Sequence, residues 1–111
     1  MNTRKRRLLV TGASGLLGNK IVELTKNDYT AIPLHKTKPL HSNSLKLDIT
    51  NAIEVLNLFH KLKPDVAIHT ASETNVDKCE TEKDQAWKIN VKGTRNIALA
   101  CSKAKIEYYK F

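Results

Sequence analysis

The amino-acid sequence predicts an α/β fold with a doubly wound parallel sheet, on three observations. Apolar periodicity alternates along the 111 residues between short β-rich runs and longer stretches at helical spacing. Three of the four glycines lie together in a turn between the first predicted strand and the first predicted helix. The run Val66-Ala67-Ile68 is apolar without alternation, which is typical of a central parallel strand covered on both faces.

The first half of the chain is predicted to hold three strands and one helix. The strands cover residues 7–11, 30–34 and 45–47, and residues 36–44 form a polar loop. The helix follows the glycines, and its stripe facing the sheet consists of Leu17, Ile21 and Leu24, spaced by four and three residues.

The second half is predicted to hold two helices, each followed by a strand. Thr50 is the expected N-cap of the first helix, which ends at Lys63-Pro64 and places on one face Ile53, Leu56 and Phe59. The second helix starts at a capping box, residues 81–84, and runs to about residue 103. Its predicted buried stripe is Ala86, Ile89, Gly93, Ile97, Ala100 and Ala104. The two strands cover residues 65–70 and 106–111.

The segment from Thr11 to Gly18 reads T-G-A-S-G-L-L-G and predicts phosphate binding. Gly12 supplies the backbone angles of a tight turn, Gly15 lets a pyrophosphate approach the main chain, and Gly18 lets the helix pack against the strand. The helix start, at Ser14, Leu16 and Leu17, offers amides and a positive dipole end. The spacing G-x-x-G-x-x-G is one residue longer than the common fingerprint, and its place between strand and helix favours nucleotide binding over an ordinary glycine-rich turn.

The turn makes residues 1–111 a predicted Rossmann-like NAD(P)-binding domain. A doubly wound sheet of this plan normally has six or more strands, and its ligand crevice lies at the carboxyl ends of the first and fourth. Four to five strands are predicted here. We therefore expect one domain that is truncated at its carboxyl end and has no substrate domain.

The residues after the second strand favour NADP over NAD. An acidic residue there would accept hydrogen bonds from the adenosine ribose and repel a 2′-phosphate. The sequence instead reads His35-Lys36-Thr37-Lys38, without a carboxylate, and Lys36 is the candidate phosphate contact. Because exposed lysines are common, NAD stays open as the alternative.

A resemblance rests on five segments that occur in register. They are residues 9–18 (LVTGASGLLG), 47–50 (LDIT), 63–72 (KPDVAIHTAS), 75–80 (NVDKCE) and 89–94 (INVKGT). Together they resemble the extended short-chain dehydrogenase/reductase family, and within it the dTDP-4-dehydrorhamnose reductase group. The same group includes a regulatory relative, the beta subunit of methionine adenosyltransferase, so the resemblance does not by itself imply catalysis.

The resemblance implies further cofactor contacts. Asp48 and Ile49 would lie along the adenine ring, with the carboxylate accepting from the exocyclic amine; alternatively, Asp48 begins the following helix, where a carboxylate suits the dipole. Ala71 and Ser72 would pass the ribose and nicotinamide. Asn90 falls on the predicted apolar stripe, and it would either brace the active site or form a structural bridge to a neighbouring strand.

Reduction in the family requires a Tyr acid, a Lys four residues later, and a Ser or Thr beside the substrate carbonyl. Tyr108, Tyr109 and Lys110 do not have this spacing and are expected in the last strand. The resemblance therefore implies the N-terminal NADP-binding portion of an oxidoreductase that transfers hydride from NADPH to the 4-keto group of a dTDP-sugar. The alternative is a non-catalytic dinucleotide-binding or regulatory module, or a truncated gene product without activity.

Charge distribution raises the question of a nucleic-acid partner. Nineteen Lys and Arg against eleven Asp and Glu give a net charge of +8, and four of the cations form a basic leader at residues 4–7. Such a leader attracts anions, but no aromatic platform or recognition-helix pattern accompanies it. We expect the leader to be solvated and no specific nucleic acid to bind.

Hydropathy and spacing bound the remaining partners. The longest aliphatic runs are about three residues, against about 20 for a membrane span, so a cytoplasmic location is expected. The four histidines show no metal-ligand spacing, and no metal is expected. An open apolar edge at the fourth or fifth strand predicts self-association.

Overall fold

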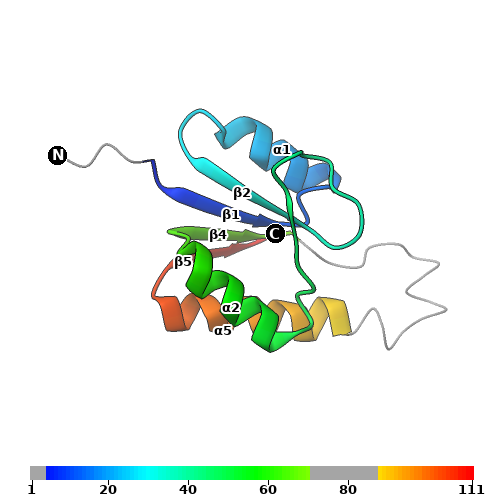
Figure 1. The fold of residues 1–111 in the computed structure, drawn as a ribbon, viewed down its shortest axis with the longest axis vertical. Helices are drawn as coiled ribbons and strands as arrows, with labels where there is room; N and C mark the ends of the chain where they lie inside the picture. Colours follow the sequence, from blue (N-terminus) through cyan, green and yellow to red (C-terminus); the bar gives the residue numbers. More distant parts are fainter. Residues whose placement is uncertain (1–4, 71–87) are drawn as a thin grey trace.

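The computed structural model describes residues 5–70 and 88–111. Five parallel strands form a sheet in the order β3-β2-β1-β4-β5. Figure 1 shows β2, β1, β4 and β5 of this sheet. The strands are β1 (Arg7–Thr11), β2 (Thr30–His35), β3 (Leu45–Lys46), β4 (Val66–His69) and β5 (Glu107–Lys110). The helices are α1 (Leu16–Thr25), α2 (Ala52–Leu62) and α5 (Thr94–Ala104), and a π-helical segment, η1 (Lys88–Gly93), precedes α5. The predicted α/β class and the parallel, doubly wound sheet are confirmed.

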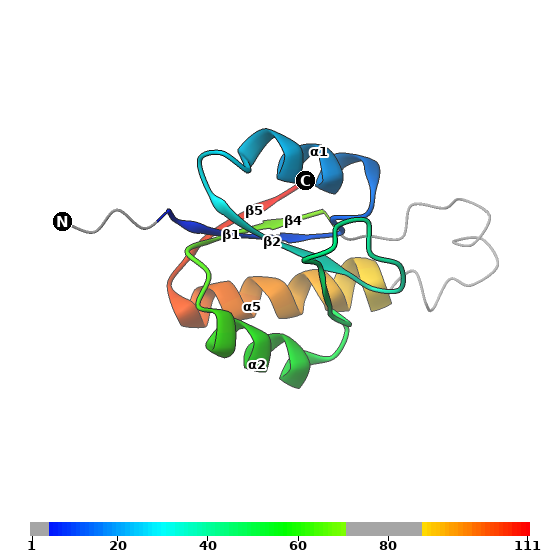
Figure 2. The same ribbon diagram turned by 45° about the horizontal axis from the view of Figure 1, so that its top comes forward.

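Helices cover both faces of the sheet. Helix α1 lies on one face, and α2 and α5 lie side by side on the other (Figure 2). Along β1 the side chains alternate between the two cores: Leu8 and Val10 pack under α1, whereas Leu9 packs on the α2 and α5 side. In β4, Val66 and Ala67 divide in the same way. The apolar run of β4 is thus that of a central parallel strand, as predicted.

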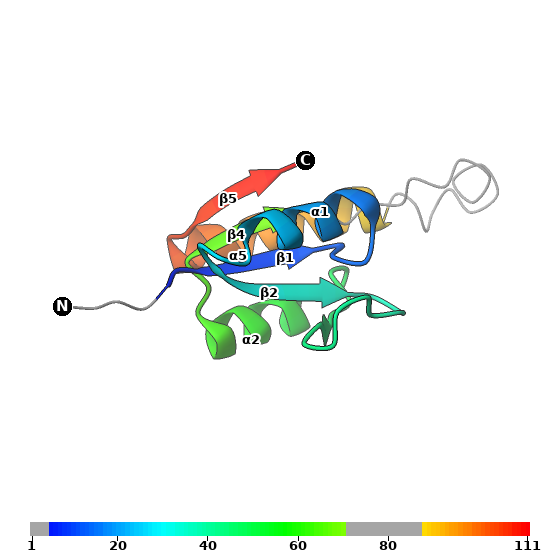
Figure 3. The same cartoon turned by 90° about the horizontal axis from the view of Figure 1, so that it is seen from above.

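Different segments of the chain lie at the two ends of the sheet. All strands run in the same direction, with β5 at one edge (Figure 3). The turn after β1 therefore lies at the carboxyl end of the sheet, and the residues preceding β1, β4 and β5 lie at its amino end. Helices that connect parallel strands run back the other way, so they begin at the carboxyl end and finish at the amino end.

Helix α1 buries a different stripe from the one predicted. Gly18 and Val22 are buried, whereas Leu17 is 47% and Leu24 69% exposed. Ile21 alone of the predicted stripe packs against the core. Gly18 must face the preceding turn because a side chain there would collide with backbone, and this contact sets the rotation of the helix.

The predicted buried face of helix α2 is also partly wrong. Val55 and Phe59 are buried, whereas Ile53 is 71% exposed and Leu56 is also exposed. Apolar residues occur on more than one side of this helix, and packing against α5 selects the side that carries Val55. Periodicity alone could not choose between the two sides.

The N-cap of α2 is Asn51, not Thr50. The side-chain oxygen of Asn51 accepts from the Glu54 amide at 3.1 Å. The Thr50 hydroxyl does not cap the helix, because it donates to the Asp48 carboxylate at 2.7 Å. Two adjacent residues are chemically suited to capping, and the bond to Asp48 decides between them.

The predicted stripe is confirmed at Gly93, the last residue of η1, and at Ile97 and Ala100 of α5, which are buried, but Ala104 is exposed. The Asn90 side chain is exposed as well, contrary to the predicted burial. Asn90 belongs to η1, and a π-helix hydrogen-bonds from i to i+5 instead of i to i+4. The helical register of α5 therefore does not extend back to Asn90. The predicted capping box, residues 81–84, lies outside the described residues.

Strand β5 contains Tyr108, Tyr109 and Lys110, as predicted for sheet residues. Its register is set by β4, with Ala67 opposite Tyr108.

In the described part of the chain, every helix is too short or too polar to cross a membrane.

Candidate functional site

The glycine turn, residues 12–18, joins the carboxyl end of β1 to α1. Gly12 has φ of 62°, a left-handed conformation that glycine adopts without steric cost. The Gly15 amide donates to the Gly12 carbonyl at 3.0 Å, and the Ala13 amide donates to the Leu34 carbonyl of β2 at 3.0 Å. The turn is therefore closed on itself and fixed to the neighbouring strand.

Gly18 faces the inside of this turn. A Cβ at this position would lie 2.7 Å from the Gly12 carbonyl carbon and 2.9 Å from the Ala13 Cα. Both atoms belong to backbone and cannot swing aside. Gly18 was predicted to let the helix pack against the strand; the close contact that requires glycine is with the turn residues Gly12 and Ala13.

Gly15 presents the opposite case. It is exposed, its φ is −83°, and a Cβ there would meet only the Gly12 carbonyl oxygen, at an ordinary 3.4 Å. Neither backbone angles nor packing within the described structure requires glycine at this position. The bare backbone of Gly15 faces outward at the start of α1, where a ligand can approach it.

The first turn of α1 is open to an anion. Gly15 is the N-cap, no side chain caps the amides, and no acidic residue lies in the first turn. Ser14 is exposed, and Leu16, at 96%, is almost completely so. The first amides of a helix have no partner within the helix and carry its positive partial charge. Donors and dipole thus point out from the carboxyl end of the sheet without a competing carboxylate.

Asp48 lies between β3 and α2, and its carboxylate has protein partners. Its Oδ1 accepts from the Thr50 hydroxyl at 2.7 Å and from the Thr50 amide at 3.0 Å. The hydroxyl bond lowers the pKa of the Asp48 carboxyl below its ordinary value and outweighs the opposing effect of desolvation. The charges of Lys36 and Lys92 lower this pKa further. Asp48 therefore closes a turn with Thr50 ahead of the N-cap Asn51 and does not itself begin α2, contrary to that alternative; an adenine contact stays a prediction.

Lys36 follows β2 directly and is exposed at the same end of the sheet as the glycine turn. Its charge helps to lower the pKa of the Asp48 carboxyl, which precedes α2. No carboxylate follows β2 in the segment His35-Lys36-Thr37-Lys38. The charge at this position is the one that the sequence predicts for a phosphate contact.

Ile49 is buried rather than open. Its side chain packs against Gly93, where a Cβ would lie 2.7 Å from the Ile49 Cγ1. Its carbonyl accepts from the Asn96 side-chain amide at 2.9 Å. Asn96 is a buried amide that bridges α5 to the segment before α2. From the sequence, such a structural bridge was one alternative for Asn90. The signal for Asn96 was its place three residues after Gly93, on the buried side of α5.

A buried polar cluster that sequence reasoning missed lies below the glycine turn. His69, at the end of β4, has Nδ1 2.7 Å from the Thr11 hydroxyl and Nε2 3.0 Å from the Thr94 hydroxyl. Burial lowers the pKa of His69 to about 4, with a further contribution from Lys110, so the ring is neutral at pH 7. A neutral imidazole has one donor and one acceptor nitrogen, which the two hydroxyls match.

Thr70 joins the cluster to the turn itself. Its amide donates to the Thr11 hydroxyl at 3.0 Å, and its hydroxyl donates to the Thr11 carbonyl at 2.6 Å. These bonds tie the ends of β1 and β4 together where the crevice of a doubly wound sheet lies. Polar residues at the ends of two apolar strands were the available signal.

Two predicted contacts, Ala71 and Ser72, lie outside the described residues. Within residues 5–70 and 88–111, no group of His, Cys, Asp or Glu is arranged to hold a metal ion. Of the remaining predicted site residues, the structure brings the glycine turn and Lys36 to one end of the sheet with Asp48.

Comparison with known sequences shows the family. Residues 6–109 match the sequence profile described as RmlD substrate binding domain. The dTDP-4-dehydrorhamnose reductase of Aggregatibacter actinomycetemcomitans is 35% identical over 94 residues, which are 85% of this chain and 30% of that protein. Methionine adenosyltransferase 2 subunit beta of Pongo abelii is 34% identical over 101 residues, or 88% of this chain and 29% of that protein.

A solved structure agrees in fold. The dTDP-4-dehydrorhamnose reductase of Bacillus anthracis, crystallised in complex with NADP, has a TM-score of 0.81 and 35% identity, and the match covers 97% of this chain and 36% of that one. The chain thus spans about 30% of the length of the curated relatives that it matches. With nearly all of its residues matched in sequence and fold, the chain belongs to the RmlD substrate binding domain family.

Proposed function

We propose that this chain is the NADP-binding part of an oxidoreductase of the dTDP-4-dehydrorhamnose reductase kind, in which NADPH transfers hydride to the 4-keto group of a dTDP-sugar. Gly15 is the observation that carries the proposal. The fold gives it no steric reason to be glycine, yet it lies beside the uncapped amides of α1. A pyrophosphate that must touch the main chain supplies the reason.

The open start of α1 fits the pyrophosphate chemically. Leu16 and Leu17 lie in the first turn, where backbone amides lack helical partners. Their dipole favours an anion, and no acidic side chain of the first turn opposes it. The exposed hydroxyl of Ser14 adds a donor next to these amides.

Lys36 supports NADP over NAD. A lysine follows β2 at this end of the sheet and would pair with a 2′-phosphate, and a carboxylate that would repel the phosphate is absent from residues 35–38. The Bacillus anthracis relative was crystallised with NADP. In this proposal Asp48 and Ile49 border the adenine, Ala71 and Ser72 border the ribose and nicotinamide, and Asn90 lies near them.

The cofactor would supply the hydride, and the described residues would bind and orient it. The turn holds the diphosphate, and the cluster of His69, Thr11 and Thr70 keeps the ends of β1 and β4 at a fixed separation below it. No residue of this chain is proposed as the proton donor. A cytoplasmic location, predicted from the sequence, is part of the same proposal.

A calorimetric titration of the 111-residue chain with NADPH and NADH tests this function. We expect saturable binding that is tighter for NADPH, and Gly15→Val should weaken it by about tenfold or more without lowering the melting temperature, because a side chain fits the fold but blocks the diphosphate. Lys20→Val, on the exposed side of α1, is the matched control and should bind normally. Equal binding by both valine variants, or no binding by the unaltered chain, would overturn the proposal.

A regulatory module is the second candidate, favoured by the 34% identity to methionine adenosyltransferase 2 subunit beta. Both candidates bind the dinucleotide, so turnover separates them. Oxidation of NADPH in the presence of a dTDP-4-keto-sugar, followed by absorbance, supports the reductase. NADPH binding without oxidation supports the regulatory module.

Self-association through the sheet edge is a further proposal. Strand β5 is an edge strand, Tyr109 is exposed on it, and Phe111 follows it. Edge strands offer unpaired backbone groups to a second chain. Light scattering at increasing concentration should show mass above 12.5 kDa, and a constant monomer mass would contradict the proposal.

A further inference from the structure

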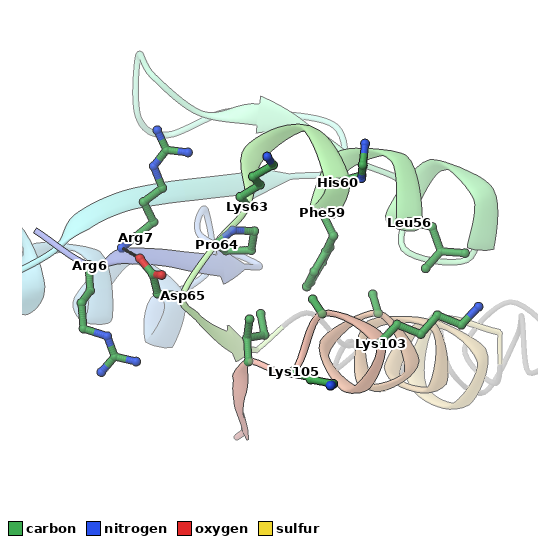
Figure 4. A pocket seen from close by; sticks show the side chains of 13 residues that line it. Arg6, Arg7, Leu56, Phe59, His60, Lys63, Pro64, Asp65, Lys103 and Lys105 are labelled. Carbon is green, nitrogen blue, oxygen red and sulfur yellow. Dashed lines mark hydrogen bonds between the residues drawn. The ribbon is translucent and has the colours of Figure 1, made fainter. Parts of the chain in front are cut away.

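A hollow lies at the amino end of the sheet, opposite the glycine turn. It has a volume of about 790 Å³ and lies between the final turns of α2 and α5 and the residues that precede β1, β4 and β5 (Figure 4). Strand β1, five residues long, separates it from the turn, a distance of about 17 Å at 3.3 Å per residue. The hollow is therefore a separate feature from the proposed cofactor site.

The hollow has a mixed polar and apolar lining and a basic rim; of its apolar residues Leu56 is exposed, whereas Phe59 and Ala100 are buried. Apolar side chains line it from both helices, among them Leu56 and Phe59 of α2 and Ala100 of α5. Five cations also line it, against one carboxylate, Asp65; the cations are Arg6, Arg7, Lys63, Lys103 and Lys105. Figure 4 shows Lys63 on the α2 side and Lys103 and Lys105 on the α5 side. Cations thus line the hollow on both sides.

The two arginines have protein partners. Arg6 forms an ion pair with Glu107 at 3.4 Å. The Arg7 guanidinium donates to the Leu62 carbonyl, and the Arg7 amide donates to the Asp65 carboxylate at 2.7 Å. The carboxylate of the hollow is therefore already engaged by the main chain.

The ammonium groups of the three lysines have no protein partner among the described residues. Within the described parts of the chain, Lys63, Lys103 and Lys105 form neither a hydrogen bond from the ammonium group nor an ion pair. Three ammonium groups therefore face the solvent around the hollow without a protein anion to neutralise them.

Capping of the helix ends does not account for these lysines. Lysine side chains often bind the last carbonyls of a helix. Here the backbone performs that role, because the Lys63 amide donates to the Phe59 carbonyl and the Lys105 amide donates to the Cys101 and Ser102 carbonyls. Both lysines adopt left-handed backbone angles, φ 48° and 56°, at a position where glycine is the favoured residue. The backbone geometry would be served better by glycine, so the charge needs another reason.

We propose that this hollow binds a small phosphorylated molecule that has an apolar or aromatic part. The phosphate is neutralised by the lysines of the rim, Lys63, Lys103 and Lys105, and the apolar part lies against Leu56 and Ile106. A volume of about 790 Å³ lies in the range of small-molecule sites, about 300–1,000 Å³. Nucleic acid fits less well, because the cations enclose a concave space and Phe59, at 4% exposed, offers no ring for a base to stack on.

Amide chemical-shift mapping of the 111-residue chain with 1-naphthyl phosphate locates the site directly. We expect saturable shifts at Lys63 and at residues 103–106, with weaker binding of inorganic phosphate, which lacks the apolar part. Shifts confined to residues 12–18 would assign the binding to the cofactor turn and overturn the proposal, as would the absence of any saturable shift. This result does not depend on whether NADPH binds.

Charge-reversal variants test the lysines. K103E with K105E should weaken 1-naphthyl phosphate binding by about fivefold or more, since each ammonium contributes in a partly shielded space. The matched control, K20E with K46E, makes the same change in net charge at exposed positions outside the hollow and should alter binding by less than about twofold. Equal loss in both pairs would reduce the effect to net charge and overturn the site.

Two further arms complete the test. Lys63→Ala probes the other wall, and it should weaken binding even if the double variant folds poorly. A duplex DNA oligonucleotide should neither displace 1-naphthyl phosphate nor bind more tightly than it does. Displacement by DNA at physiological salt would assign the surface to nucleic acid instead and overturn the small-molecule proposal.

Discussion

The carboxyl and amino ends of the sheet attract anions by different means. At the carboxyl end, α1 begins with uncapped amides and no acidic residue in its first turn. At the amino end, α2 and α5 finish, and three lysines surround their last turns. Helices that return between parallel strands leave positive partial charge at the carboxyl end and negative partial charge at the amino end. Backbone alone can hold an anion at the first end, whereas the second needs side-chain cations.

The two ends also differ in what their residues contribute to folding. Gly12, Gly18 and His69 at the carboxyl end are in contact with backbone or buried hydroxyls. Lys63 and Lys105 at the amino end hold left-handed conformations that disfavour any side chain. Substitutions at the first end should therefore destabilise the protein, and selected substitutions at the second end should stabilise it.

Gly18→Ala should have the largest effect. Because a Cβ would overlap backbone atoms of the glycine turn, we expect the free energy of unfolding to fall by about 3 kcal/mol or more. Gly15→Ala is the matched control and should change it by less than about 1 kcal/mol, since its Cβ meets ordinary contact. Urea denaturation measures both. Equal effects would remove the distinction between the two glycines.

Lowering the pH should have the second largest effect, because it destabilises the fold at the carboxyl end of the sheet. The pKa of His69 is about 4 in the folded chain and near 6.5 when unfolded, so the unfolded state binds more protons between these values. The neutral ring's contribution is complete above pH 6.5 and is lost as the pH falls toward 4. By pH 5 the loss should be about 2 kcal/mol. Denaturation of His69→Gln at pH 7.5 and 5 should show a smaller difference than the unaltered chain; an unchanged difference would assign the acid sensitivity elsewhere.

Asn51→Ala should have a smaller effect at the same end. The loss of the hydrogen bond to the Glu54 amide should lower the free energy of unfolding by about 1 kcal/mol. Helical signal and urea denaturation together measure it. The comparison with Thr50→Ala separates the cap from the Asp48 turn: only the threonine variant should raise the pKa of Asp48, since the Thr50 hydroxyl is what chiefly lowers it.

Lys105→Gly should act in the opposite direction at the amino end. Glycine accepts the left-handed angle without strain, at the cost of more freedom in the unfolded chain, so we expect a gain of about 0.5 kcal/mol. The same variant should bind 1-naphthyl phosphate more weakly. A loss of stability would show that the Lys105 side chain supports the fold, although its ammonium group has no partner among the described residues.

Sequence patterns predicted the element order, the parallel sheet and the glycine turn because these depend on neighbouring residues. Val66-Ala67-Ile68 needs no partner to indicate a buried strand, and the spacing of Gly12, Gly15 and Gly18 indicates a strand-to-helix turn by itself. The family match over residues 6–109 agrees with the fold that these local patterns predicted.

Tertiary contacts decided which side of each helix is buried. Leu17 and Leu24 continue a plausible apolar stripe, but the backbone contact at Gly18 turns them outward. The predicted burial of Asn90 failed because the π-helical segment changes the register, and Asn96 provides the bridge to Ile49. Helical periodicity cannot anticipate either contact, because each partner comes from a distant part of the chain.

By itself the sequence determined the strand–turn–helix unit at residues 7–25, since glycine conformations and apolar periods are properties of short segments. Only the tertiary structure placed Thr11, His69 and Thr94 in one buried cluster and gathered Lys63, Lys103 and Lys105 around one hollow. Residues so far apart in the chain meet through strand order and helix direction, which long-range packing of the whole domain decides.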